Sequence, residues 1–155
     1  MVLDSHMTRI HTAIHIRKPI AEVFTHVTTP CNWPHWHPAS LAVSGATDHS
    51  LECGEQVTED FQIGGRRAQA LWTVKECEAP RRWVIEGHTA RGGWATIVYR
   101  FSENENGTLF ERELRYSMPG LWFRLADALL GRRRMRAQSA EALERVKKVL
   151  EAGRG

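Results

Sequence analysis

The feature that most constrains the fold is a series of alternating segments joined by short turns between residues 56 and 117. Within each segment, alternate side chains share one side of an extended chain, as in a β-strand. The turns combine glycine pairs with proline and Asn–Gly signals, at Gly64-Gly65, 79–81, Gly92-Gly93 and 104–107. Such short connections join antiparallel neighbours. The sequence therefore predicts five successive strands in an antiparallel meander.

Other elements flank this meander. A strand is expected over about 9–16, and Pro19 then opens a helix, because proline suits a first helical turn. A short strand is expected at Leu41–Val43. Residues 121–152 predict one long amphipathic helix, with a kink or break at Gly131. Its expected apolar face consists of Leu125, Leu129, Arg136, Ala140, Leu143 and Leu150.

The segment Pro30–Ala42 stands between these parts and contains two tryptophans, two histidines and three prolines. Its prolines exclude a long helix or a central strand. We expect a short helical turn followed by an extended exit. Trp33 and Trp36 then either seal one end of the core or form the wall of a pocket mouth.

Several short motifs resemble the START-like/Bet v 1-like (SRPBCC) superfamily, and within it the polyketide cyclase/dehydrase group. They are Lys18–Phe24, Trp36–Pro38, Gly54-Glu55, Glu78–Trp83 and Gly107-Thr108, in this order. The resemblance implies an α+β helix-grip fold. In that fold a curved seven-stranded antiparallel sheet wraps around a long C-terminal helix, two short helices follow the first strand, and a cavity lies inside. Members bind lipids, sterols, polyketides or hormones, and some catalyse cyclisation or dehydration.

The chain of 155 residues has the length of one domain. Ser5-His6-Met7 resembles the remnant of a cleaved affinity tag, so we expect residues 1–7 to be foreign and 8–153 to form a single START-like domain. The sequence lacks an apolar run of membrane-spanning length. Its cysteines, Cys31, Cys53 and Cys77, are odd in number and widely spaced, which favours a cytoplasmic location.

Strand parity predicts which side chains face the cavity. The charged side of the last strand should face water, so its other side faces inward. Applied to all strands, this argument predicts a mostly apolar wall with a few polar groups, as small-molecule sites require. With the two tryptophans of the proline-rich segment, the predicted ligand-binding residues are Arg112, Tyr99, Tyr116, Glu59, Trp72, Phe61, Phe110, Trp36 and Trp33.

Arg112 is the most informative of these residues, because an inward arginine requires a partner. One interpretation is that its guanidinium binds an acidic or carbonyl group of a ligand. A second is a structural ion pair with Glu59, and a third is reversed strand parity, which would leave Arg112 in solvent. Tyr99 and Tyr116 either donate hydrogen bonds or protons to a ligand, or fill the core.

The sequence also contains residues suited to two further chemistries. Cys31, His35 and His37, with His26, are residue types that bind zinc, but their spacing matches no common zinc motif. We therefore expect surface histidines and neither metal nor cofactor. The cluster Arg132–Arg136 suits an anionic membrane or a partner. Alternatively it is a solvated helix face with one arginine side chain lying over the sheet, and a further possibility is that Arg132 or Arg136 points into the cavity.

The sequence thus favours binding of a small hydrophobic molecule, such as a lipid, polyketide or aromatic metabolite, with one acidic or carbonyl group. A polyketide aromatase/cyclase or dehydratase-like enzyme is the first alternative, with its catalytic residues unknown. A membrane- or protein-interaction module acting through Arg132–Arg136 is the second. Nucleic acid is not expected as a partner, because the net charge is only +3 and the aromatic residues are not interleaved with the basic ones.

Overall fold

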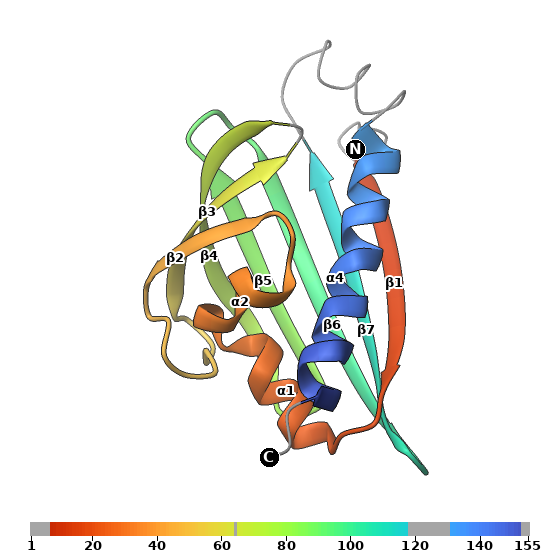
Figure 1. The fold of residues 1–155 in the computed structure, drawn as a ribbon. Helices are drawn as coiled ribbons and strands as arrows, with labels where there is room; N and C mark the ends of the chain where they lie inside the picture. Colours follow the sequence, from red (N-terminus) through yellow and green to blue (C-terminus); the bar gives the residue numbers. More distant parts are fainter. Residues whose placement is uncertain (1–6, 64, 118–130, 153–155) are drawn as a thin grey trace.

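A computed structural model of the protein describes residues 7–63, 65–117 and 131–152. Seven antiparallel strands form one curved sheet around a long C-terminal helix (Figure 1), which confirms the predicted α+β helix-grip fold. The strands are β1 (Thr8–Ile16), β2 (Ser40–Gly45), β3 (Gln56–Ile63), β4 (Arg66–Glu78), β5 (Arg82–Thr89), β6 (Trp94–Asn104) and β7 (Gly107–Ser117). The helices are α1 (Ile20–Thr28), the short 3-10 turn η2 (Pro30–Asn32), α2 (Trp33–Trp36) and α4 (Arg132–Ala152).

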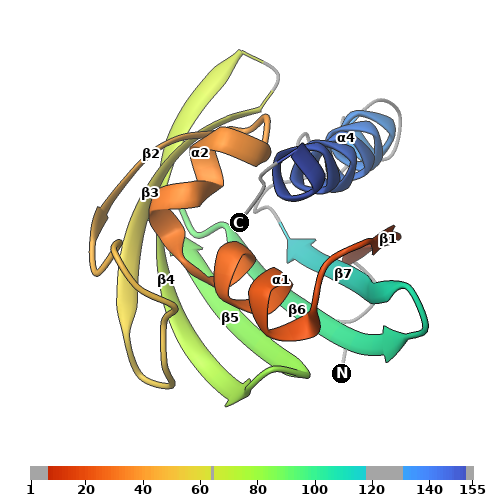
Figure 2. The same cartoon turned by 60° about the horizontal axis from the view of Figure 1, so that its bottom comes forward.

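The strand order is β1-β7-β6-β5-β4-β3-β2. The predicted meander from β3 to β7 is therefore confirmed, and it includes the two-residue link in which Ile63 pairs with Arg66. The first strand, β1, forms one edge of the sheet and pairs with the last strand, β7. Thr8 lies opposite Tyr116 and Ile16 lies opposite Thr108. Register shifts in β2 and β4 mark bulges, which bend strands and increase their twist. The result is a concave face that encloses the helices (Figure 2).

The helices α1 and α2 cover one end of this concave face, and α4 runs along the rest of it beside β1 (Figures 1 and 2). The apolar stripe of α1 is buried as its spacing requires, through Ile20, Val23, Phe24 and Val27. The prolines of the next segment permit only η2 and the four-residue α2, so the prediction of short helical structure there is correct.

The buried face of α4 differs from the predicted one. It consists of Ser139, Ala142, Leu143, Val146 and Leu150. Leu143 and Leu150 were predicted correctly, whereas Arg136 and Ala140 are exposed. Ala142 and Val146 are apolar and stand at helical spacing from Leu143 and Leu150, but the prediction chose Arg136 and Ala140, which lie on a neighbouring face of the helix. The part of the predicted helix at 121–130, with Leu125 and Leu129, lies outside the described residues, as do residues 1–6 of the proposed tag remnant.

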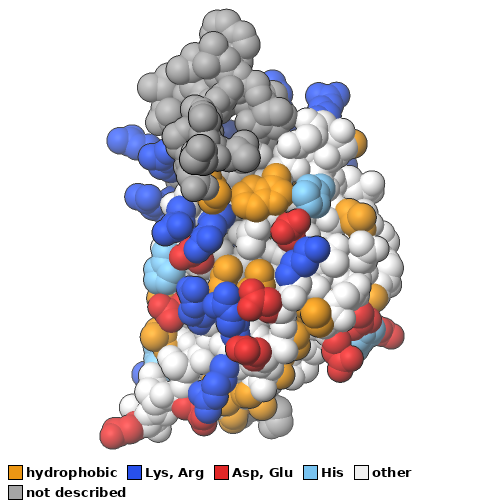
Figure 3. Space-filling model, turned by 180° about the vertical axis from the view of Figure 1, so that it is seen from behind, with side chains coloured by type: hydrophobic (Ala, Val, Ile, Leu, Met, Phe, Trp, Pro, Cys, Tyr) orange, Lys and Arg blue, Asp and Glu red, His pale blue; other side chains and the backbone are white. Residues whose placement is uncertain are grey.

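Strand parity is correct across the sheet. The inward side chains of β6 and β7, among them Ile97, Tyr99, Phe110 and Leu114, are buried against the helices. Ala68 has the predicted parity but is exposed, because it lies close to the turn between β3 and β4. The opposite, convex face carries mixed charges (Figure 3), among them the ion pairs Arg9–Glu113 and Arg82–Glu76. The apolar side chains of the sheet are therefore concentrated on its concave side.

Candidate functional site

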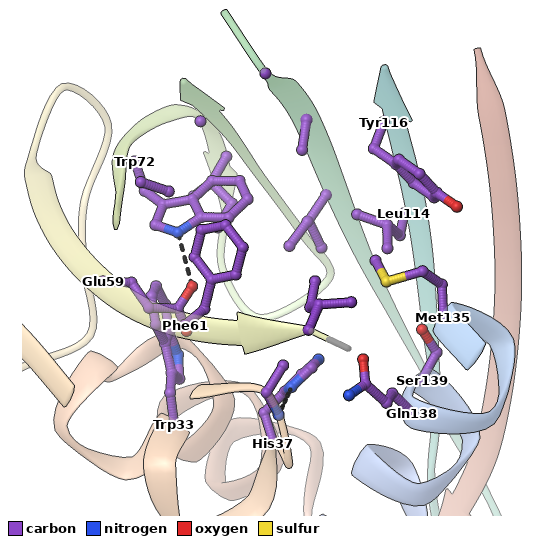
Figure 4. A pocket seen from close by; sticks show the side chains of 18 of the residues that line it. Trp33, His37, Glu59, Phe61, Trp72, Leu114, Tyr116, Met135, Gln138 and Ser139 are labelled. Carbon is purple, nitrogen blue, oxygen red and sulfur yellow. Dashed lines mark hydrogen bonds between the residues drawn. The ribbon is translucent and has the colours of Figure 1, made fainter. Parts of the chain in front are cut away.

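A pocket lies between the concave face of the sheet and the helices α2 and α4 (Figure 4). Its volume is about 120 Å³, similar to a cavity that holds one benzene ring. Most of its surface is apolar, and aromatic rings from β3, β4 and α2 contribute much of the wall. The interior is therefore not packed solid, and space for a guest remains between the sheet and α4.

Eight of the nine predicted ligand-binding residues line this pocket: Arg112, Tyr99, Tyr116, Glu59, Trp72, Phe61, Trp36 and Trp33. The exception is Phe110. It is completely buried and stacks on Phe101 with ring centroids 5.1 Å apart, so it belongs to the core and not to the pocket wall. Parity alone does not separate these two environments, because both lie on the same side of the sheet.

Arg112 reaches the pocket from the middle of β7, and only 4% of it is exposed. Its Nη1 donates to Ser139 Oγ on α4 at 3.1 Å. Its Nη2 lies 3.2 Å from His37 Nε2, and its Nε has no hydrogen-bond partner among the described residues. A buried guanidinium with an unpaired N–H group is unusual, since buried charges in folded proteins are normally paired.

The proposed ion pair between Arg112 and Glu59 is not formed. In the part of the chain that the structure describes, no Asp or Glu pairs with Arg112. Glu59 instead accepts a hydrogen bond from Trp72 Nε1 at 3.0 Å (Figure 4). The two residues come from strands at different places in the sheet, and their side chains meet different neighbours. The positive charge of Arg112 is thus not neutralised by a described carboxylate.

Burial also disfavours a negative charge on Glu59. It raises the pKa of this carboxyl above its usual value, against the opposing effects of hydrogen bonding and the Arg112 charge. The carboxyl accordingly holds its proton to a higher pH than an exposed glutamate. The pocket therefore combines one unpaired cation with an acid whose ionisation is disfavoured, and this combination favours an acceptor or anion as guest.

His37 lies beside Arg112 at the C-terminal end of α2, where Pro38 turns the chain into the approach to β2. The backbone N–H of Ala39 donates to His37 Nδ1 at 3.1 Å. Burial lowers the pKa of His37 well below its usual value, and the charges of Arg112 and Arg145 lower it further. The imidazole is thus held neutral within the pocket.

Tyr99 and Tyr116 both line the pocket and are buried. The Tyr99 ring stacks on Trp83 at 5.2 Å and meets Phe110 edge-on at 5.0 Å. Burial raises the pKa of Tyr99 to about 12, despite the nearby Arg112 charge. Tyr99 therefore combines a core-filling ring with a hydroxyl that keeps its proton and can donate a hydrogen bond.

Trp33 and Trp36 are buried and line the pocket at its α2 side. Trp33 Nε1 donates to the carbonyl oxygen of Val27 at 2.9 Å, which ties α2 to α1. Trp36 Nε1 is buried and has no hydrogen-bond partner in the described part of the chain. The two residues therefore close this end of the sheet and at the same time form pocket wall.

Sequence reasoning missed the contribution of α4 and one histidine. Met135, Gln138 and Ser139 line the pocket from α4, and His37 lines it from the end of α2. The spacing of the three α4 residues by three and four would have placed them on one helix face. No sequence pattern marks that face as the one that meets Arg112.

The two other predicted chemistries have different outcomes. Within the described ranges, no three His, Cys, Asp or Glu side chains group as metal ligands. Cys31 and His35 are exposed, whereas His37 faces Arg112.

The predicted basic cluster lies at the beginning of α4, where Arg132, Arg133, Arg134 and Arg136 are all exposed. Neither Arg132 nor Arg136 lines the pocket. No helix of the described chain combines the length and hydrophobicity needed to cross a bilayer.

Residues 7–151 match the family model described as "Polyketide cyclase / dehydrase and lipid transport". No curated protein matches the sequence. Similar solved structures share the fold at low sequence identity, and the resemblance to START-like and Bet v 1-like proteins is confirmed.

Three of these structures illustrate the sequence identities and TM-scores that were found. DynU16, a protein of the dynemicin biosynthetic locus, is 17% identical with a TM-score of 0.66, over 92% of this chain and 47% of that chain. This chain therefore spans about half the length of DynU16. CV1439 from Chromobacterium violaceum is 12% identical with a TM-score of 0.67, over 95% and 98% of the two chains. Ara h 8.0201 is 10% identical with a TM-score of 0.63, over 95% and 99%.

Proposed function

The chain belongs to the polyketide cyclase/dehydrase and lipid transport family, and from that premise we propose that it binds one small, largely apolar molecule in its internal pocket. A volume of about 120 Å³ suits a single ring or a short chain as the buried part of the guest. Apolar burial at about 25 cal/mol per Å² supplies the affinity. The polar side chains Arg112, Tyr99, Tyr116 and Glu59 orient the guest.

The observation that carries the proposal is the state of Arg112. It is 4% exposed, one of its N–H groups is unpaired among the described residues, and it faces a largely apolar pocket. A guest with an acceptor group, acidic or carbonyl, would satisfy that N–H group. A buried charged group without a hydrogen-bond partner is destabilising. A ligand that accepts a hydrogen bond from Arg112 would therefore stabilise the folded protein.

The test is the variant Arg112→Leu, studied with 4-phenylbutyrate and with the apolar probe butylbenzene. Quenching of tryptophan fluorescence reports binding, because Trp33, Trp36 and Trp72 line the pocket. We expect the variant to lose most of its affinity for 4-phenylbutyrate, to retain butylbenzene, and to keep a melting temperature near that of the wild type. A wild-type protein that binds neither probe would overturn the proposal.

A second candidate is an enzyme acting on an enolisable ketone. The observation that favours it is that Arg112 and Glu59 line the same pocket. The Arg112 cation would stabilise an enolate, and the Glu59 carboxyl, whose pKa is raised, would transfer the proton. Exchange of the α-protons of a phenyl β-ketoester in D₂O, followed by NMR, tests this role. The enzyme proposal requires exchange above the buffer rate that disappears in Glu59→Gln.

We place this activity in the cytoplasm, because Cys31, Cys53 and Cys77 are all free thiols. A membrane- or protein-interaction role through Arg132–Arg136 has support only from the exposure of these arginines. It is kept as an alternative and is separated by sedimentation with anionic vesicles.

A further inference from the structure

The two ring nitrogens of His37 both face hydrogen-bond donors. The backbone N–H of Ala39 lies 3.1 Å from Nδ1, and Arg112 Nη2 lies 3.2 Å from Nε2. A neutral imidazole has one acceptor nitrogen and one N–H group. Only one of the two contacts can therefore be a hydrogen bond. In the other contact, two N–H groups face each other.

The contact with Ala39 is the one that persists. Ala39 is buried, and its N–H group belongs to a backbone that β2 and the neighbouring turn hold in place. Leaving this N–H unpaired is unfavourable, whereas the long side chain of Arg112 can shift. Acceptance at Nδ1 places the imidazole proton on Nε2, so that His37 presents an N–H group to the pocket beside Arg112.

The free edge of Arg112 has matching geometry. Nη1 is held by Ser139, so Nε and Nη2 remain on the other edge of the planar guanidinium. These two parallel N–H groups match the two oxygens of a carboxylate. One oxygen would accept from Nε, and the other would accept from both Nη2 and His37 Nε2.

We propose that Arg112 and His37 form a carboxylate-binding subsite, and that the natural guest is a small aromatic or short-chain carboxylic acid. The inference rests on the proposed ligand-binding function and narrows its ligand to one class. Ser139 holds the guanidinium from α4, and the Ala39 N–H group sets the tautomer of His37. The carboxylate removes the conflict between the two donors and neutralises the buried charge. Charged groups that act on this subsite are Arg145 on α4 and Glu59 on β3.

The experiment compares two ligands of equal shape, 4-phenylbutyrate and 4-phenylbutanamide, by calorimetry at neutral pH. We expect the wild type to bind the carboxylate at least about tenfold more tightly, since charge-assisted bidentate pairs are roughly twice as strong as neutral hydrogen bonds. In His37→Phe this preference should fall several-fold while the affinity for the amide stays unchanged. His37→Gln, which restores an N–H donor, should recover part of the preference. Arg112→Lys keeps the charge but loses the paired edge, and should also lose most of the preference.

NMR on protein with ¹⁵N-labelled histidine gives a readout that does not depend on the variants folding. We expect His37 to be in the neutral Nε2–H form, with a downfield shift of this proton when the carboxylate is added but not when the amide is added. Equal affinities for the two ligands would overturn the subsite while leaving the binding function intact. A carboxylate preference that survives in His37→Phe, or an Nδ1–H tautomer, would overturn the role of His37. Binding of neither ligand would remove the function itself.

Discussion

Individual side chains in this pocket matter through what their neighbours allow them to do. His37 would titrate near pH 6.5 in the unfolded chain, but burial and two arginines hold its pKa well below that value in the folded chain. Below pH 6.5 the unfolded state therefore binds a proton that the folded state does not. The contribution of His37 to stability is present above the unfolded pKa and is lost as the pH falls through the interval below it.

This sign leads to a prediction about acid sensitivity. Between pH 6.5 and the folded pKa of His37, the wild type should lose up to about 1.4 kcal/mol of unfolding free energy per pH unit on account of this residue. The variant His37→Gln should show a shallower slope in urea denaturation across the same interval. The exposed His35→Gln serves as the control and should follow the wild type. Parallel curves for the wild type and His37→Gln would contradict the assignment.

Pairs of elements set the shape of the pocket. Trp72 on β4 lies opposite Gly87 on β5, and the indole covers the glycine. A Cβ added at Gly87 would lie 2.5 Å from Trp72 Cε3, which is closer than atoms can approach. Glycine is therefore required here by the space that the ring of Trp72 occupies.

We expect Gly87→Ala to destabilise the fold by about 1–3 kcal/mol, the range found for overpacked cores. It should also weaken ligand binding, because the displaced indole holds Glu59 at 3.0 Å. Urea denaturation and fluorescence titration measure the two effects. In a double-mutant cycle, Trp72→Leu should relieve most of the cost of Gly87→Ala. Additive effects would show that the clash is not the cause.

The helix α4 allows a matched test of its orientation. Ala142 is completely buried, whereas Ala140, two residues earlier, is exposed. We expect Ala142→Leu to cost about 1–3 kcal/mol through overpacking, and Ala140→Leu to change stability by less than about 0.5 kcal/mol. Thermal denaturation distinguishes the two variants. A larger loss of stability in Ala140→Leu than in Ala142→Leu would show that the face predicted from the sequence is the buried one.

At the scale of the whole molecule, exposed positive charge is concentrated at one end of the described chain. Exposed arginines follow the ends of the pocket-lining segments, at the turns after β3 and β5 and at the beginning of α4, all at one end of the molecule (Figure 1). They are Arg66, Arg67, Arg91, Arg132, Arg133, Arg134 and Arg136. The other end carries both signs: Glu78, Glu103 and Glu105 lie in its turns together with Arg17, Lys18 and Arg81, and Arg81 pairs with Glu103. The small net charge of +3 does not reveal that positive charge is concentrated at one end.

Such a field should attract an anionic ligand toward the pocket. We expect the association rate of 4-phenylbutyrate to fall between roughly 10 mM and 150 mM salt, as the Debye length shortens from about 30 Å to about 8 Å. Stopped-flow fluorescence measures this rate. The neutral 4-phenylbutanamide should show little salt dependence, and a triple variant Arg66→Gln, Arg91→Gln, Arg133→Gln should flatten the response to the anion. A salt effect that is equal for both ligands would exclude steering.

The residue pattern by itself determined the meander, the short helices and the inward side of the meander strands, whereas the seven-stranded sheet wrapped around the helix was implied by the family resemblance. Alternation with a period of two, turn residues and proline positions are local signals, and they act between residues close in the chain. The same parity placed Arg112, Glu59 and Tyr99 on the pocket side before any contact was known.

Only the tertiary structure decided which of these side chains meet. Arg112 on β7 contacts His37 beyond α2 and Ser139 on α4, residues 75 and 27 positions away in the chain. It does not pair with Glu59, although the sequence made that pair attractive. The separation of Phe110 from the pocket was decided in the same way. Such contacts depend on the curvature of the sheet and on the position of α4 against it, and no local periodicity records either quantity.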